Sequence, residues 1–123
     1  MEFNELIQNI NKSADELDFI SARKFIEENL SILLDQKHLL NSNSRDLLNF
    51  IIQSKESGAE PLKRQELGII NALNTYASKF DLRGLKLTVK ENATLLLRTD
   101  IVQYLNSDAK IILQGMGAIN KGN

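Results

Sequence analysis

The chain has 123 residues, a formal net charge of −1 and no cysteine. Its length suits one domain, and its hydrophobic fraction of 42% and charged fraction of 25% are typical of a folded, water-soluble protein. The lack of cysteine excludes a disulfide framework, a thiolate zinc site and a cysteine nucleophile, and the net charge argues against a strongly basic nucleic-acid binder.

The N-terminus lacks the features of a secretory signal. Its first twelve residues, MEFNELIQNINK, carry acids and amides where such a signal has a basic start and a continuous apolar run. We therefore expect no export, a cytoplasmic location and no membrane partner.

Charge is distributed unevenly along the chain. Residues 1–43 contain eight acids and four bases, whereas residues 44–98 contain nine bases and six acids. Such a mild dipole is typical of ordinary solvated surfaces, so it does not by itself identify a partner.

The first third of the chain shows a helical apolar pattern. Apolar side chains recur at three- and four-residue steps from Phe3 to Ile10, which predicts a short amphipathic helix. The next four residues, Ser13–Glu16, form a capping-box pattern, which predicts that a second helix starts there. Its broad apolar stripe continues to Leu34, and residues 13–54 are predicted to be the scaffold of the fold.

Part of this second helix resembles a known repeat. Residues 18–30, DFISARKFIEENL, resemble the second helix of a tetratricopeptide repeat, with Ala22, Ile26 and Leu30 at that family's packing positions. No second copy appears at the 34-residue period of the family. We therefore interpret the stretch as general helical-hairpin packing.

Two further helices are predicted in the middle of the chain. The polar cluster Asn41–Ser44 can cap a helix whose apolar pairs run from Leu47 to Ile52, and this helix would form an antiparallel hairpin with the second one. Glu60-Pro61 then favours the start of another helix that runs to about Lys79.

Residues 85–98 have the pattern of a β-hairpin. Leu85, Leu87 and Val89 alternate with polar residues, Glu91-Asn92 can form a turn, and residues 93–98 supply the second strand. A helix through Leu95–Leu97 is the competing prediction for the second half of this segment.

The chain is predicted to end in a helical region. Thr99-Asp100 can cap its start, Ser107-Asp108 can restart it, and Gly115 with Gly117 can close it. The predicted fold is therefore mainly α: a small bundle of about five helices with one β-hairpin near residues 85–98. We expect one domain over residues 1–118 and a flexible tail at 119–123.

The sequence contains no pattern that predicts catalysis. The single histidine, His38, lies at a predicted helix end, where a cation is favourable. The densest acidic group, Asp15, Glu16 and Asp18, fits the first turn of a helix better than a metal site. We therefore expect no enzymatic activity, no metal and no cofactor.

Two functions remain as hypotheses. The leading one is a non-enzymatic regulator, adaptor or inhibitor that binds another protein or a second copy of itself, through its surplus apolar surface. The alternative is a winged-helix-like DNA-binding regulator built from residues 44–98, with the hairpin as its wing. Its DNA contacts would be Lys63, Arg64, Arg83 and Lys86.

Overall fold

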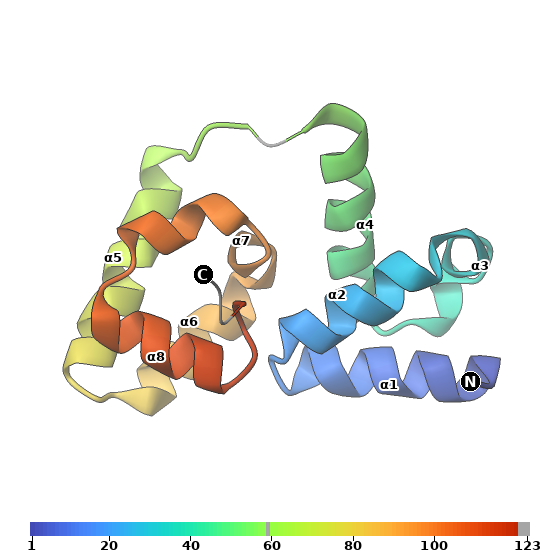
Figure 1. Cartoon of the computed structure of the whole chain (residues 1–123), viewed down its shortest axis with the longest axis horizontal. Helices are drawn as coiled ribbons and strands as arrows, with labels where there is room; N and C mark the ends of the chain where they lie inside the picture. Colours follow the sequence, from blue (N-terminus) through green and yellow to red (C-terminus); the bar gives the residue numbers. More distant parts are fainter. Residues whose placement is uncertain (59, 121–123) are drawn as a thin grey trace.

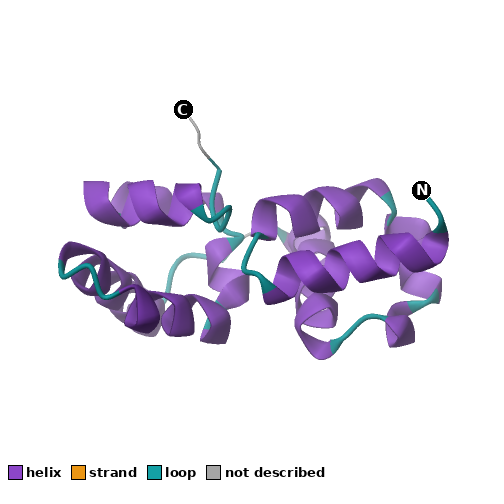
Figure 2. Cartoon of the chain, turned by 90° about the horizontal axis from the view of Figure 1, so that it is seen from below, coloured by secondary structure: helices purple, strands orange, loops and turns teal. Residues whose placement is uncertain are grey.

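The computed structural model describes residues 1–58 and 60–120, and every regular element in these ranges is helical (Figures 1 and 2). The first five elements are α1 (Phe3–Asp15), α2 (Phe19–Glu28), α3 (Leu30–Asp35), the 3-10 helix η1 (Lys37–Leu39) and α4 (Ser42–Ser57). The next five are α5 (Arg64–Ser78), α6 (Leu82–Glu91), α7 (Ala93–Leu96), the 3-10 helix η2 (Thr99–Tyr104) and α8 (Ser107–Gly115).

These elements form two copies of one unit. The first repeat, α1 to α4, and the second repeat, α5 to α8, share the same order of long helix, medium helix, short helix, 3-10 helix and final helix. Equivalent residues are 63 apart through the short helices and 65 apart afterwards, because the second repeat has two more residues around η2. Equivalent pairs include Asn11 and Asn74, Asp18 and Asp81, Asn29 and Asn92, Asn41 and Asn106, and Leu48 and Leu113.

An asparagine on the first helix ties each repeat together. The Asn11 side chain accepts a hydrogen bond from the backbone N–H of Asn41 at 3.0 Å, and Asn74 accepts the same bond from Asn106 at 2.9 Å. Asn41 and Asn106 in turn cap the final helices, accepting from the backbone N–H three residues on. The start of the last helix is thus fixed to the first helix in both repeats.

The turn between the first two helices is also repeated. Leu17 and Phe80 have φ values of 65° and 58°, the left-handed conformation that L residues rarely adopt. The next residues, Asp18 and Asp81, cap α2 and α6 by accepting from backbone N–H groups. The turn into the medium helix is therefore built in the same way in both repeats.

The predicted start of the second helix is wrong. Ser13–Glu16 does not begin a helix: α1 extends to Asp15, and the chain turns at Leu17. Asp18 is the residue that caps α2, because its carboxylate accepts from Ser21 N at 3.2 Å. The capping-box pattern lies one turn too early.

The predicted β-hairpin at residues 85–98 is also wrong. This segment is α6 followed by α7 and a short turn, and the described residues contain no strand. Leu85 and Val89 are buried at an i,i+4 spacing on one helical face, whereas Leu87 between them is 56% exposed. Two apolar residues four positions apart can lie on one face of a strand or on one face of a helix. Here the cap that Asp81 provides favours the helix.

Buried apolar side chains form one core that continues through both repeats. The helix predicted from Pro61 to Lys79 is confirmed as α5, although it starts at Arg64. Ile119, which we assigned to the tail, is buried, and residues 121–123 of that predicted tail lie outside the described residues. No helix in the described ranges is long and apolar enough to cross a membrane.

Replacing Asn74 with alanine should destabilise the fold. It removes the acceptor for Asn106 N–H and the donor to the Tyr104 carbonyl, which lies 2.9 Å from Asn74 Nδ2. We expect the free energy of unfolding in urea to fall by about 1–2 kcal/mol. Asn71→Ala on the same helix is the control: Asn71 is exposed, so its replacement should be neutral or slightly stabilising. Equal losses of stability in the two variants would contradict the role of the Asn74–Asn106 hydrogen bond.

Replacing Phe80 with glycine should stabilise the chain in dilute solution. Phe80 is 74% exposed and has a positive φ, so glycine relieves the backbone at little cost in packing. We expect a gain of about 0.5–1 kcal/mol in the free energy of unfolding. Leu17→Gly is the matched variant. Leu17 has the same backbone conformation as Phe80 but is only 9% exposed, so its replacement should destabilise the fold. A loss of stability in both variants would refute this interpretation.

Candidate binding site at the repeat junction

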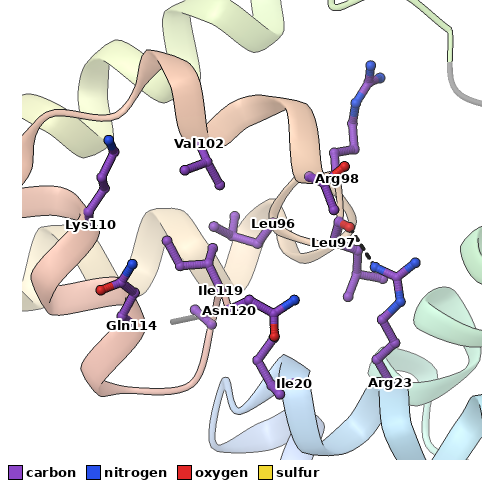
Figure 3. Close-up of a pocket in the computed structure, with 12 residues that line it drawn as sticks. Ile20, Arg23, Leu96, Leu97, Arg98, Val102, Lys110, Gln114, Ile119 and Asn120 are labelled. Atoms are coloured by element: carbon purple, nitrogen blue, oxygen red, sulfur yellow. Dashed lines mark hydrogen bonds between the residues drawn. The ribbon is translucent and has the colours of Figure 1, made fainter. Parts of the chain in front are cut away.

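A pocket of about 620 Å³ lies where the two repeats meet (Figure 3). We call it the junction pocket. It is bounded by α2 from the first repeat, by the segments after α6 from the second, and by residues 118–120. Its lining residues are Ile20, Arg23, Leu96, Leu97, Arg98, Thr99, Val102, Lys110, Gln114, Ala118, Ile119 and Asn120.

The inside of the junction pocket is apolar. Leu96, Val102 and Ile119 lie together in its centre, and Ile20 approaches them from α2 (Figure 3). A hydrogen bond from Ile20 N–H to the Gly117 carbonyl, at 3.0 Å, holds the segment after α8 against the start of α2. A pocket of this volume and lining can enclose an apolar side chain or a small ligand.

Arg23 forms one polar edge of the pocket and links the repeats. Its Nη1 donates to the Leu97 carbonyl at 2.8 Å (Figure 3). Its Nε lies 3.5 Å from the Glu27 carboxylate. Glu27 is shared with Lys55, whose Nζ is 3.9 Å away. The Arg23 charge is thus partly compensated, and its main contribution is to hold α7 against α2.

Arg98 also lines the pocket, and its guanidinium is held by other groups. Its guanidinium donates to both carboxylate oxygens of Asp100, at 3.0 and 2.7 Å, and also to the Glu60 carbonyl in the segment that joins the repeats. The bond to Asp100 raises the pKa of Arg98, and the bond from Arg98 holds the pKa of Asp100 below its ordinary value. This pair fixes the linker and does not supply a free charge.

The opposite wall is formed by Lys110 and Gln114 of α8 (Figure 3). In the part of the chain that the structure describes, no carboxylate lies within 4.0 Å of Lys110. Gln114 adds an amide with both donor and acceptor atoms. The pocket thus has an apolar interior, a cationic rim and no histidine or carboxylate among its described lining residues.

The four residues predicted for DNA binding lie as two pairs at opposite ends of α5. Lys63 and Arg64 are exposed at the start of α5, and Arg83 and Lys86 are exposed on the first turns of α6. α5 has 15 residues, so it separates the two pairs by about 20 Å. The winged-helix prediction also required a hairpin wing at residues 85–98, where the chain is helical.

The acidic group and the histidine take structural or surface positions. Asp15 accepts hydrogen bonds from the side chains of Asn41 and Asn43, and Asp18 caps α2. His38 is exposed on η1. Among the described residues, no group of three or more His, Asp or Glu side chains could hold a metal ion.

No local sequence pattern indicates the junction pocket. Its walls come from residues 20–23, 96–102 and 110–120, which meet only after both repeats have folded and packed. Arg23 could be recognised only as an i,i+4 partner of Glu27, and Lys110 belongs to no pattern. The repeat itself had a signal, the recurrence of Asp18, Asn29 and Asn41 in the second half, but at an offset of 63–65 and not 34.

Replacing Asp100 with asparagine should destabilise the chain in a pH-dependent way. The pKa of Asp100 is lower in the folded state, so its contribution is present above the ordinary value of 3.8 and is lost as the pH falls through the folded value. The difference between wild type and Asp100→Asn in urea unfolding should therefore shrink from neutral to strongly acidic pH. Asp46→Asn, at an exposed position on α4, is the control. A difference that is constant with pH would contradict the ion pair.

Comparison with known protein families, curated proteins and solved structures finds no match to this chain. The geometry of the junction pocket is therefore the basis for the function proposed below.

Proposed function

We propose that this chain is a non-enzymatic cytoplasmic module that binds a segment of another protein in the junction pocket. The partner segment carries one large apolar side chain next to an acidic residue. The observation that supports this proposal is the combination of an apolar interior with Lys110, a cation without a carboxylate partner in the described chain, at the rim.

The apolar interior would supply most of the affinity. Burying a leucine or phenylalanine side chain against Leu96, Val102 and Ile119 is favourable by about 1.5–3 kcal/mol. Peptide-binding sites commonly use such a pocket to hold one anchor side chain, while polar groups at the edge fix the orientation of the backbone. Gln114 is placed to form such a backbone contact.

The rim would select the charge of the partner. Asp100 neutralises the charge of Arg98, and Glu27 partly neutralises the charge of Arg23. Lys110 is therefore the cation that would attract an incoming carboxylate. A basic segment would be repelled by Lys110 at this edge. Charge complementarity of this kind contributes more to specificity and association rate than to affinity.

The same lining supports binding over catalysis. General acid–base chemistry near neutral pH depends mainly on histidine or carboxylate groups, and the described lining has neither. Cationic and amide side chains around an apolar interior are suited to recognition. A regulator, adaptor or inhibitor needs no more than this.

The proposal is tested by selecting peptides from a random displayed library on the wild-type chain. We expect the selected peptides to share a large apolar residue beside Asp or Glu. Their affinity, measured by fluorescence anisotropy, should fall about tenfold or more in Lys110→Glu and in Val102→Lys, which place the wrong charge at the rim and inside the pocket.

Lys86→Glu is the matched control, because Lys86 is an exposed lysine that does not line the pocket. It makes the same charge change and should leave peptide affinity unchanged. Selected peptides without an acidic residue, or equal losses in Lys86→Glu and Lys110→Glu, would refute the proposed site.

A further inference from the structure

The two repeats are joined through unlike faces. The corner face of the first repeat, Leu17 and Phe19, lines the same small cavity as Lys90 and Ala93 of the second repeat. Next to it, Arg23 donates to the Leu97 carbonyl. The first repeat therefore uses the corner between its long and medium helices.

The second repeat uses a different part of the unit. Its short-helix face consists of Leu95 and Leu97, on and just after α7, and α7 contacts α4 of the first repeat. Both side chains are buried, with 5% and 6% exposed. The interface thus joins the corner face and α4 of the first repeat to α7 and the residues beside it in the second, which include the short-helix face.

Each repeat also contains the face that its neighbour uses, and there it is uncovered. The corner face of the second repeat is Phe80 and Leu82, which are 74% and 39% exposed, whereas their equivalents in the first repeat are at most 9% exposed. The short-helix face of the first repeat is Ile32 and Leu34, which are 45% and 48% exposed. These two uncovered faces lie at opposite ends of the molecule, at the α5–α6 corner and at α3 (Figure 1).

The junction is not a two-fold arrangement. Lys86 is the equivalent of Arg23, and Leu34 is the equivalent of Leu97, each 63 residues away. In a two-fold pair, the hydrogen bond from Arg23 to Leu97 would therefore be matched by a bond from Lys86 to Leu34. Leu34 is 48% exposed, and the described chain shows no such contact. Head-to-tail contacts of this type leave one unfilled face at each end and can continue into a further copy.

Two observations favour the same partner for both ends. Phe80 keeps a large apolar side chain at an exposed position whose backbone disfavours it, which points to a role outside the monomer. The net charges beside the two faces are opposite: Lys79, Asp81 and Arg83 sum to +1 at the corner face, while Glu28, Asp35 and Lys37 sum to −1 at the short-helix face. A corner face is thus complementary to a short-helix face and repels another corner face.

We infer that a second copy of this chain is the partner at these faces. Phe80 and Leu82 of one copy dock on Ile32 and Leu34 of the next and reproduce the contact that joins the two repeats within a chain. The chain therefore associates head to tail and not as a symmetric dimer. Because the flanking charges attract, salt weakens the association.

The inference is tested by light scattering after size exclusion and by sedimentation equilibrium, from micromolar to millimolar chain concentration. The wild-type mass should rise with concentration, and less so in high salt. Phe80→Asp and Ile32→Asp should each raise the dissociation constant about tenfold or more. Ile111→Asp is the control: Ile111 is 67% exposed, but its equivalent Asp46 is exposed too and lies outside the junction.

Mixing the two variants gives the sharper result. Phe80→Asp keeps a usable short-helix face and Ile32→Asp keeps a usable corner face, so the mixture should form a 1:1 dimer while each variant alone stays monomeric. Circular dichroism checks that each variant is folded, and Leu34→Asp replaces Ile32→Asp if the latter is not.

Three results would overturn the inference. A wild-type chain that is monomeric at every concentration would assign the two faces to another protein. Association that is lost in Phe80→Asp but unchanged in Ile32→Asp and Leu34→Asp would indicate a symmetric corner-to-corner dimer. Folded single variants whose mixture does not associate would show that the two faces do not bind each other.

Discussion

Each half of this chain depends on one hydrogen bond between distant residues. The start of a helix leaves backbone N–H groups without partners, and an asparagine that caps the helix normally exposes its own N–H to water. Here the side chains of Asn11 and Asn74, on the first helix of each repeat, accept that N–H from Asn41 and Asn106. Because the bond spans about 30 residues, it fixes where the final helix crosses the first and thereby closes the unit around its apolar core.

Repetition of this unit explains the other features of the molecule. Two similar units that join through unlike faces create one junction and leave one face of each kind open. The junction encloses a pocket because Arg23 links α2 to the residue after α7, and the Gly117 carbonyl is bonded to the start of α2, around an apolar centre. The open faces account for the exposed apolar side chains of Phe80 and Ile32, which no contact within the chain requires.

The helical class, the first helix, the Asn41 cap and α5 were predictable, because each depends on local spacing and capping. The hairpin prediction failed because the spacing of Leu85 and Val89 fits both a strand and a helix. Only the exposure of Leu87, which a strand would bury with them, distinguishes the two structures. The helix start at Ser13 failed because the positive φ of Leu17 has no reliable sequence signal. The junction pocket was not predictable at all, since its walls are brought together by packing between repeats.

Amide hydrogen exchange at Asn41 and Asn106, followed by NMR, tests the account most directly. Both N–H groups precede a helix and have no partner within it, so their protection depends on Asn11 and Asn74 alone. The account predicts slow exchange at both, compared with Ser42 and Ser107, the first residues of α4 and α8. Exchange at Asn41 and Asn106 as fast as at these serines, or protection in one repeat only, would contradict the view that both halves are closed by the same bond.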